Sequence, residues 1–385
     1  MANENLGAAR KAKFDEFYTQ YHDIEKEMNA YLDYDENVFR DKTILLPCDD
    51  PEWSNFTKYF AQNFERLGLK KLISTSYAPD SKPQELNLQL ALFEIQHPKF
   101  DKVKARANGK IYTLTRDATG DKKINVEDLE WEYLKGDGDF RSSEVSALRD
   151  EADIVITNPP FSLFREFLEW IVAAGKKAVI IGNMNAITYK EVFRLIKGGS
   201  LWVGATNFNT GMYFRVPDNF VHDESYKFER ERDGAKVNRV PGVCWYTSLD
   251  HGRRHEPLTL MNEADNIRFN KKLKGLPYAK YDNYDAIEVP YADAIPSDFP
   301  GVMGVPISFL SKFNPDQFEI LGMCENEDLY QLKSKRYTSA ECKAAYLVKF
   351  KKMGTYDLNA SGVLFQDGQY EKVYQRILIK HKRTS

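Results

Sequence analysis

Four short strand-like runs, alternating with helical patterns, constrain the fold of this chain more than any other feature. They occupy residues 42–47, 71–76, 152–157 and 177–182. The apolar runs among them do not alternate with polar residues as a half-exposed strand does. Such unbroken apolar runs are typical of parallel strands buried on both faces. Strands that alternate with helices predict an α/β fold with a doubly wound, mostly parallel sheet. Ligands of such sheets bind at the carboxyl ends of the strands.

Helix-start and helix-end signals support this alternation. Asp50 as N-cap, with Pro51 and Glu52 after it, predicts a helix that ends at Gly68. A second helix is expected over residues 162–174. The other expected elements are helices over 11–31 and 189–196, strands over 201–204 and 243–248, and a hairpin around 118–122.

The length of the chain suits two domains. It has 385 residues, and the alternation fades near residue 260, after which Pro, Tyr and Asp become frequent. We therefore expect a sheet domain at 1–260, interrupted by an insertion at about 79–130, and a smaller region at 261–385.

Composition argues against a membrane protein and against a disulfide or zinc scaffold. No stretch approaches the roughly 18 uninterrupted apolar residues that a membrane span requires, and the first twenty residues contain no apolar signal segment. The four cysteines are far apart and form no CxxC pair. We expect a cytoplasmic protein that holds no metal.

Charge is distributed unevenly along the chain, although the net charge is only -3. Residues 1–50 carry 6 basic and 12 acidic side chains, whereas residues 333–385 carry 12 basic and 4 acidic ones. A polyanionic partner would therefore contact the C-terminal end. A solvated basic tail explains the same charge equally well.

The sequence NPPF at residues 158–161 directly follows a buried-strand pattern. The two prolines remove two backbone donors, so that the side-chain oxygen of Asn158 and the carbonyl of Pro159 can accept hydrogen bonds. Phe161 adds a flat apolar face after Pro160. Together these groups suit a planar heterocycle with an exocyclic amine. An ordinary Asn-Pro turn between strand and helix is the alternative.

These residues resemble the catalytic motif of amino-methyltransferases, and more of the chain is similar to one branch of them. Phe17, Tyr18 and Thr19 resemble the amino-terminal cofactor motif of that branch. Blocks at residues 47–56, 182–193, 243–251 and 304–321 resemble the EcoRI-type adenine-specific DNA methyltransferase family. The resemblance implies a Rossmann-like fold that binds S-adenosylmethionine, with a smaller C-terminal target-recognition region.

The cofactor site that this resemblance implies departs from the general pattern at the first strand. Pro47, Cys48, Asp49 and Asp50 stand where a glycine-rich turn is usual. Asp49 or Asp50 is expected to bind the cofactor's ammonium group, although Asp50 could equally be a helix cap.

Residues 138–140 resemble another cofactor-binding block of such methyltransferases. Asp139 is expected to accept a hydrogen bond from the cofactor's adenine amine, and Phe140 to pack on its ring. A solvated turn is the alternative for this segment. No acidic residue follows the second strand, so the ribose partner stays unassigned.

Two basic groups are candidate contacts to the phosphates of a DNA duplex. One comprises His251, Arg253 and Arg254, and the other comprises Lys351 and Lys352. A further basic run at residues 268–274 could equally be a solvated face.

The resemblance implies a site-specific transfer of methyl to N6 of an adenine flipped out of double-stranded DNA. The enzyme would act as a monomer without metal, in restriction–modification beside a cognate endonuclease, or as an orphan or phage methylase. Two alternatives stay open: an enzyme that modifies RNA adenine or protein glutamine, and a DNA-binding relative without activity.

Overall fold

The computed structural model describes residues 18–47, 49, 54–78, 99–208, 210–215, 228–230 and 236–382. Phe17, Cys48 and Asp50 lie outside these residues, as does part of the expected insertion. The chain divides into two compact units, which are described separately. Unit 1 comprises Met1–Ala186 and Leu201–His251, and unit 2 comprises Ile187–Ser200 and Gly252–Ser385.

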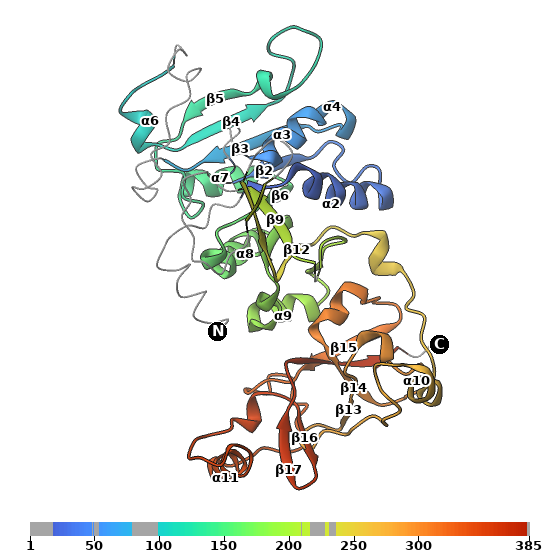
Figure 1. Ribbon diagram of the computed structural model, residues 1–385. Helices are drawn as coiled ribbons and strands as arrows, with labels where there is room; N and C mark the ends of the chain where they lie inside the picture. The colour runs from blue at the N-terminus through green and yellow to red at the C-terminus, as the bar shows by residue number, and fades with distance from the viewer. Residues whose placement is uncertain are drawn as a thin grey trace. The chain divides into compact units, whose positions relative to one another are not determined.

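Four parallel strands form the centre of the eight-stranded sheet in unit 1 (Figure 1). In spatial order they are β3 (Lys71–Ser76), β2 (Thr43–Leu46), β6 (Ile154–Thr157) and β7 (Lys177–Asn183). Every residue of β2 and β6 is buried. These are the four strands that the sequence predicts, and their carboxyl ends lie at one edge of the sheet.

Antiparallel strands extend this sheet on both sides. On the β3 side lie β4 (Lys110–Leu114) and β5 (Glu130–Tyr133), and on the β7 side lie β12 (Val243–Thr247) and β8 (Trp202–Val203). The sheet is therefore mixed rather than mostly parallel. The hairpin expected within the insertion exists as β4 and β5, but these strands continue the central sheet because β3 leaves an edge for β4 to pair with.

Within the described residues, two helices differ from their predicted bounds. The first helix after β2, α3 (Asn55–Gln62), begins after Ser54, whose hydroxyl accepts hydrogen bonds from two backbone amides of its first turn. Ser54 is thus the cap that Asp50 was expected to provide. Residues 11–17 of the helix predicted over 11–31 lie outside the described residues. The described part consists of strand β1 (Tyr18–Thr19) followed by helix α2 (Tyr21–Tyr34).

The other helices of unit 1 follow the prediction more closely. α4 (Phe64–Leu67) ends at Gly68, which adopts the left-handed conformation that a glycine C-cap favours. The helix expected at 162–174 is a 3₁₀ turn, Phe161–Leu163, continued by α8 (Phe164–Ala173). Two further helices are α6 (Lys104–Ala107) and α7 (Ser143–Glu151).

A second, four-stranded antiparallel sheet in unit 1 contains β1 (Tyr18–Thr19). It has the order β1-β9-β11-β10. Its other strands are β9 (Met212–Arg215), β11 (Lys236–Val240) and β10 (Phe228–Arg230). Tyr18 is paired with Arg215 and Thr19 with Phe214, so the described part of the predicted amino-terminal cofactor motif is held in a strand.

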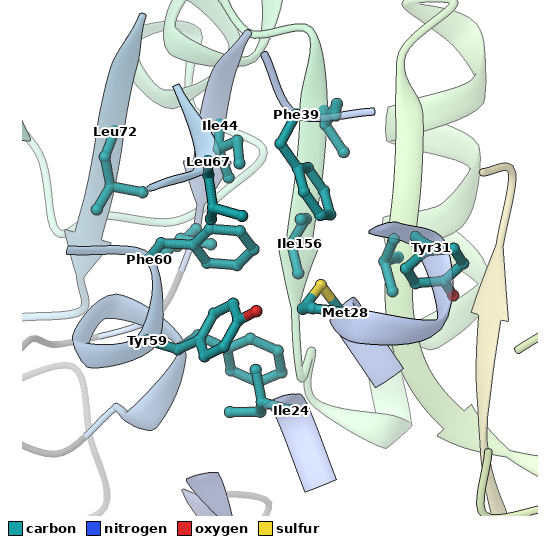
Figure 2. Packing of buried hydrophobic residues seen from close by; sticks show 14 of the residues in the cluster. Ile24, Met28, Tyr31, Phe39, Ile44, Tyr59, Phe60, Leu67, Leu72 and Ile156 are labelled. Carbon is teal, nitrogen blue, oxygen red and sulfur yellow. The ribbon is translucent and has the colours of Figure 1, made fainter. Parts of the chain in front are cut away.

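The core of unit 1 lies between the sheet and its helices. Figure 2 shows side chains of α2 and α3, such as Met28 and Phe60, pointing toward Ile44 and Ile156 of the central strands. Phe39 meets Phe60 edge to face at 5.7 Å between ring centroids. This packing fixes the helices over the central strands.

Unit 2 is built on a four-stranded sheet of order β13-β14-β18-β15. The strands are β13 (Ala286–Glu288), β14 (Val302–Pro306), β18 (Arg376–His381) and β15 (Phe318–Met323). Within this sheet, the guanidinium of Arg376 donates bidentate hydrogen bonds to the buried carboxylate of Glu288. The other elements of unit 2 are α9 (Lys190–Lys197), α10 (Glu263–Phe269), α11 (Ser339–Phe350) and the hairpin of β16 (Val363–Gln366) and β17 (Gln369–Lys372).

Candidate active site

Residues 158–161 form a sharp turn at the carboxyl end of β6. The turn continues into a 3₁₀ segment, in which the Leu163 amide donates to the carbonyl of Pro160 at 2.9 Å. Asn158 is partly buried, and Phe161 packs against the main core cluster with part of its surface exposed. The motif therefore stands where an open α/β sheet binds ligands.

Asp49 connects this turn with the neighbouring strand. The Thr157 hydroxyl donates to Asp49 Oδ2 at 2.5 Å and lies 2.8 Å from the carbonyl oxygen of Pro47. Asp49 is 7% exposed, so both oxygens of its carboxylate lie in a largely dry site. The end of β2 is thereby joined to the residue that immediately precedes Asn158.

Helix α3 and strand β3 meet the same aspartate. Ser54, the N-cap of α3, donates its hydroxyl proton to Asp49 Oδ1 at 2.7 Å. The main-chain carbonyl of Asp49 accepts from the hydroxyls of Thr57 and Ser74. Three adjacent strands and the start of a helix are thus connected through one residue.

Thr19 lies close to this network. Its backbone carbonyl accepts a hydrogen bond from Asn55 Nδ2 at 2.8 Å, and Asn55 is the first residue of α3. The Thr19 side chain is buried, yet its Oγ1 atom has no hydrogen-bond partner among the described residues. A buried polar group without a partner is costly, so this hydroxyl fits a site that is completed by a bound molecule.

Asp139 lies beside the carboxyl end of β3. Gly138 allows the close approach, because it has a positive φ of 89° and a Cβ there would overlap the carbonyl oxygen of Ser76. The hydroxyl of Tyr77 donates to Asp139 Oδ2 at 3.1 Å. Asp139 therefore lies at the carboxyl end of β3, the strand that pairs with β2.

Arg141 donates hydrogen bonds to both oxygens of the Asp139 carboxylate. Its Nε donates to Oδ1 at 2.9 Å and a terminal nitrogen to Oδ2 at 2.5 Å. These hydrogen bonds lower the pKa of the Asp139 carboxyl. A ligand amine that bound Asp139 would have to share this acceptor with Arg141, whose side chain is 49% exposed and also lies 3.4 Å from the carboxylate of Glu166.

Phe140 does not suit the ring contact that was expected of it. Its side chain is 2% exposed and meets Phe167 and Trp170 of α8 edge to face, at 5.0 and 5.5 Å between ring centroids. Phe140 is therefore part of the packing beneath α8. The correction arises because the sequence showed an aromatic residue after Asp139 but not which way it points.

His251 is also corrected as a candidate phosphate contact. It is 4% exposed, with its Nε2 3.1 Å from the carbonyl oxygen of Val203 and its ring 6.0 Å from that of Tyr31. A side chain packed in this way cannot reach a DNA backbone. Arg253 is exposed and Arg254 is partly exposed, and both Lys351 and Lys352 are exposed, so these four keep access to a ligand.

The described residues show neither a metal-binding cluster nor a membrane-spanning helix. They contain no group of three or more His, Cys, Asp and Glu side chains placed to hold a metal ion. Within the same residues, no helix combines the length and the apolar character that crossing a membrane requires.

Several residues that build the site were missed by sequence reasoning. Ser54, Asn55 and Tyr77 all contact the predicted residues, but hydroxyl and amide side chains near strand ends are too common to stand out. Ser54 carried one usable signal, since serine three residues after a proline competes with Asp50 as a helix cap.

Comparisons with known proteins agree with this geometry. The chain is 44% identical over 322 residues to the Type II methyltransferase M.EcoRI of Escherichia coli, covering 83% of this chain and 89% of that protein. It is 35% identical over 319 residues to the Type II methyltransferase M.MpnI of Mycoplasma pneumoniae, covering 83% and 85% of the two chains. No solved structure matches. The family model described as "Adenine-specific methyltransferase EcoRI" matches residues 5–382, so this chain belongs to the EcoRI-type family of adenine-specific methyltransferases.

Proposed function

We propose that this adenine-specific DNA methyltransferase transfers methyl from S-adenosylmethionine to the N6 amine of an adenine flipped out of a short duplex site. The observation that carries the proposal is the turn at residues 158–161, at the carboxyl end of β6. The relatives named M.EcoRI and M.MpnI are called Type II methyltransferases, which supports a role in restriction–modification beside a cognate endonuclease.

In this proposal Asn158 and Pro159 bind the target amine. The side-chain oxygen of Asn158 and the carbonyl of Pro159 accept the two N6 hydrogens, which leaves the nitrogen lone pair directed out of the plane of the base. Phe161 stacks on the base and holds it outside the duplex. The acceptors favour the positive charge that develops on nitrogen, and catalysis is chiefly positioning and electrostatic stabilisation.

The residues around Asp49 form the proposed cofactor site. S-adenosylmethionine supplies an activated methyl group when it is bound. Thr19 fits such a site because its buried hydroxyl has no hydrogen-bond partner in the part of the chain that the structure describes. Asp139 beside Tyr77 is the proposed acceptor for the adenine amine of the cofactor, and Asp49 acts mainly by holding the turns together, since both of its carboxylate oxygens accept hydrogen bonds.

The wider assignments rest on the sequence. We propose that the enzyme acts as a monomer, needs no metal and works in the cytoplasm, and that residues from unit 2 contact the duplex. Arg253 and Arg254 are the proposed backbone contacts in place of His251, with Lys351 and Lys352 as a second group.

Incubation of the purified protein with S-adenosylmethionine and genomic DNA from a methylation-free host tests the proposal. Sequencing that detects N6-methyladenine should find it at one short sequence, with no added metal and in the presence of a chelator. Methyl found on cytosine, only on RNA, or on protein glutamine would overturn the assignment. Specific binding of DNA without transfer would identify an inactive relative.

A further inference from the structure

Four large apolar side chains are exposed together at the C-terminal end of α11 and in the turn that follows. Leu347 is 48% exposed, Val348 44%, Phe350 43% and Met353 86%. We call these residues, with the lysines described below, the α11 surface. Scattered exposed apolar residues are ordinary, but a cluster within seven consecutive positions indicates a contact surface.

The folding of α11 does not explain this exposure. The helix buries only Cys342 and Ala345 against a small core that also includes Tyr337, Leu358 and Val363. Small residues thus face the core, while larger apolar residues of the same helix face outward. For stability alone the opposite arrangement would bury more apolar area.

The exposed end of the helix is nevertheless well ordered by its own contacts. The rings of Tyr346 and Phe350 lie 4.6 Å apart, and those of Phe350 and Tyr356 lie 5.7 Å apart. Gly354 packs directly against the Tyr346 ring, where a Cβ would overlap it. The turn therefore folds back on the helix, and these contacts fix the backbone that carries Met353.

Three exposed lysines surround the apolar residues. Lys343, Lys351 and Lys352 form no ion pair within the part of the chain that the structure describes. Other basic residues of the C-terminal segment have such partners: Lys335 pairs with Asp282, Lys349 with Glu371 and Arg376 with Glu288. The lysines of the α11 surface therefore carry positive charge that no described acidic side chain neutralises.

We propose that the α11 surface docks on duplex DNA, with lysines on the phosphates and Leu347, Val348 and Met353 against apolar groups of a groove. This inference rests on the proposed function. Positive charge matches the polyanion, and apolar side chains contact thymine methyl groups and sugar edges. The surface then contributes two separable parts of affinity: one depends on salt and the other does not.

Two variants of the full-length protein separate these parts. In the apolar variant, Leu347→Ser and Met353→Ser are combined; Phe350 is kept because it orders the turn. In the charge variant, Lys343→Gln and Lys352→Gln are combined; Lys351 is kept because its positive φ of 55° caps the helix. The matched controls are Leu276→Ser, at a side chain 65% exposed elsewhere in unit 2, and Lys312→Gln, at an exposed lysine.

Affinity for a duplex that carries the protein's target sequence is measured across a series of salt concentrations. The apolar variant should bind about 10-fold more weakly at every salt concentration, with an unchanged slope. The charge variant should flatten the slope of log affinity against log salt by up to about 2. The controls should match the wild type, and thermal unfolding should show that all variants are folded.

Two results would overturn the inference. One is wild-type affinity in the folded apolar variant. The other is a wild-type dimer in sedimentation that this variant dissociates, because the surface would then bind a second copy of the chain. Neither result affects the proposed methyl transfer, which instead fails if the wild type does not methylate duplex DNA. A dimer would contradict only the proposed monomeric state.

Discussion

The hydroxyl of Thr157 donates a hydrogen bond of 2.5 Å to the carboxylate of Asp49, across from β6 to the turn after β2. Thr157 is the last residue before Asn158, and Asp49 also binds the cap of α3 through Ser54. The proposed catalytic turn and the proposed cofactor turn are therefore joined by one buried contact. Loss of this contact should therefore disturb both turns.

Replacing Thr157 tests this connection. Thr157→Val keeps the shape of the side chain but leaves the buried Asp49 carboxylate without one donor, which should cost about 1–3 kcal/mol of unfolding free energy. Cofactor affinity and turnover should both fall. Thr157→Ser keeps the hydroxyl and is the matched control. Calorimetric titration with S-adenosylmethionine and single-turnover methylation measure the two effects; normal values of both in the folded valine variant would contradict the coupling.

Asn158 should affect turnover far more than cofactor binding. Asn158→Ala removes an acceptor that is used as charge develops on the target nitrogen, so the single-turnover rate should fall by about 100-fold or more. Cofactor affinity should change little, since the residues proposed to bind the cofactor are intact. A near-normal rate at saturating DNA would mean that residues 158–161 are only a turn.

Phe161 has a different expected effect, because its role is to stack on the flipped base. Phe161→Ala should weaken retention of that base by roughly 1–3 kcal/mol. A fluorescent 2-aminopurine at the target position reports the flipped state, and its signal should fall together with the rate. Phe161→Trp retains a stacking face and should preserve the signal. Equal signals from the alanine variant and the wild type would exclude the stacking role.

The central strands and the position of the proposed catalytic turn could be predicted because local sequence determines them. A fully buried strand such as β6 needs an unbroken apolar run, and consecutive prolines end it wherever they occur. Gly68 was predictable for the same reason, since a left-handed C-cap favours glycine. In each case the physical cause lies within a few residues of the feature.

Other features depend on distant parts of the chain and could not be predicted. Phe140 is buried because α8 packs over it, and His251 is buried because it meets Val203 and Tyr31. The sequence showed residue types that suit a ligand in both cases. Whether a side chain faces a ligand or the core depends on packing partners that are close only in the folded protein.

Glu27 of α2 is another such residue, and it leads to a prediction about pH. Its buried carboxylate accepts hydrogen bonds from the Tyr31 hydroxyl at 2.6 Å and from the backbone amides of Ala205 and Thr206 at 2.9 and 2.8 Å. Burial nevertheless raises the pKa of this carboxyl above its usual value of 4.5. Glu27 joins α2, which follows the Thr19 strand, to the segment after β8.

The sign of the pH effect follows from the raised pKa. The folded state holds the proton more tightly than the unfolded chain, so the stabilisation from Glu27 is complete below about pH 4.5 and is lost as pH rises through the folded pKa. In Glu27→Gln the side chain cannot titrate, and its amide faces backbone donors, which should cost about 1–3 kcal/mol at low pH. Urea unfolding from pH 4.5 to 8 should show the difference from wild type narrowing as pH rises. Glu25→Gln, at an exposed position of the same helix, should show no such trend. A difference for Glu27→Gln that widens with pH would mean that hydrogen bonds to the charged form outweigh the effect of burial.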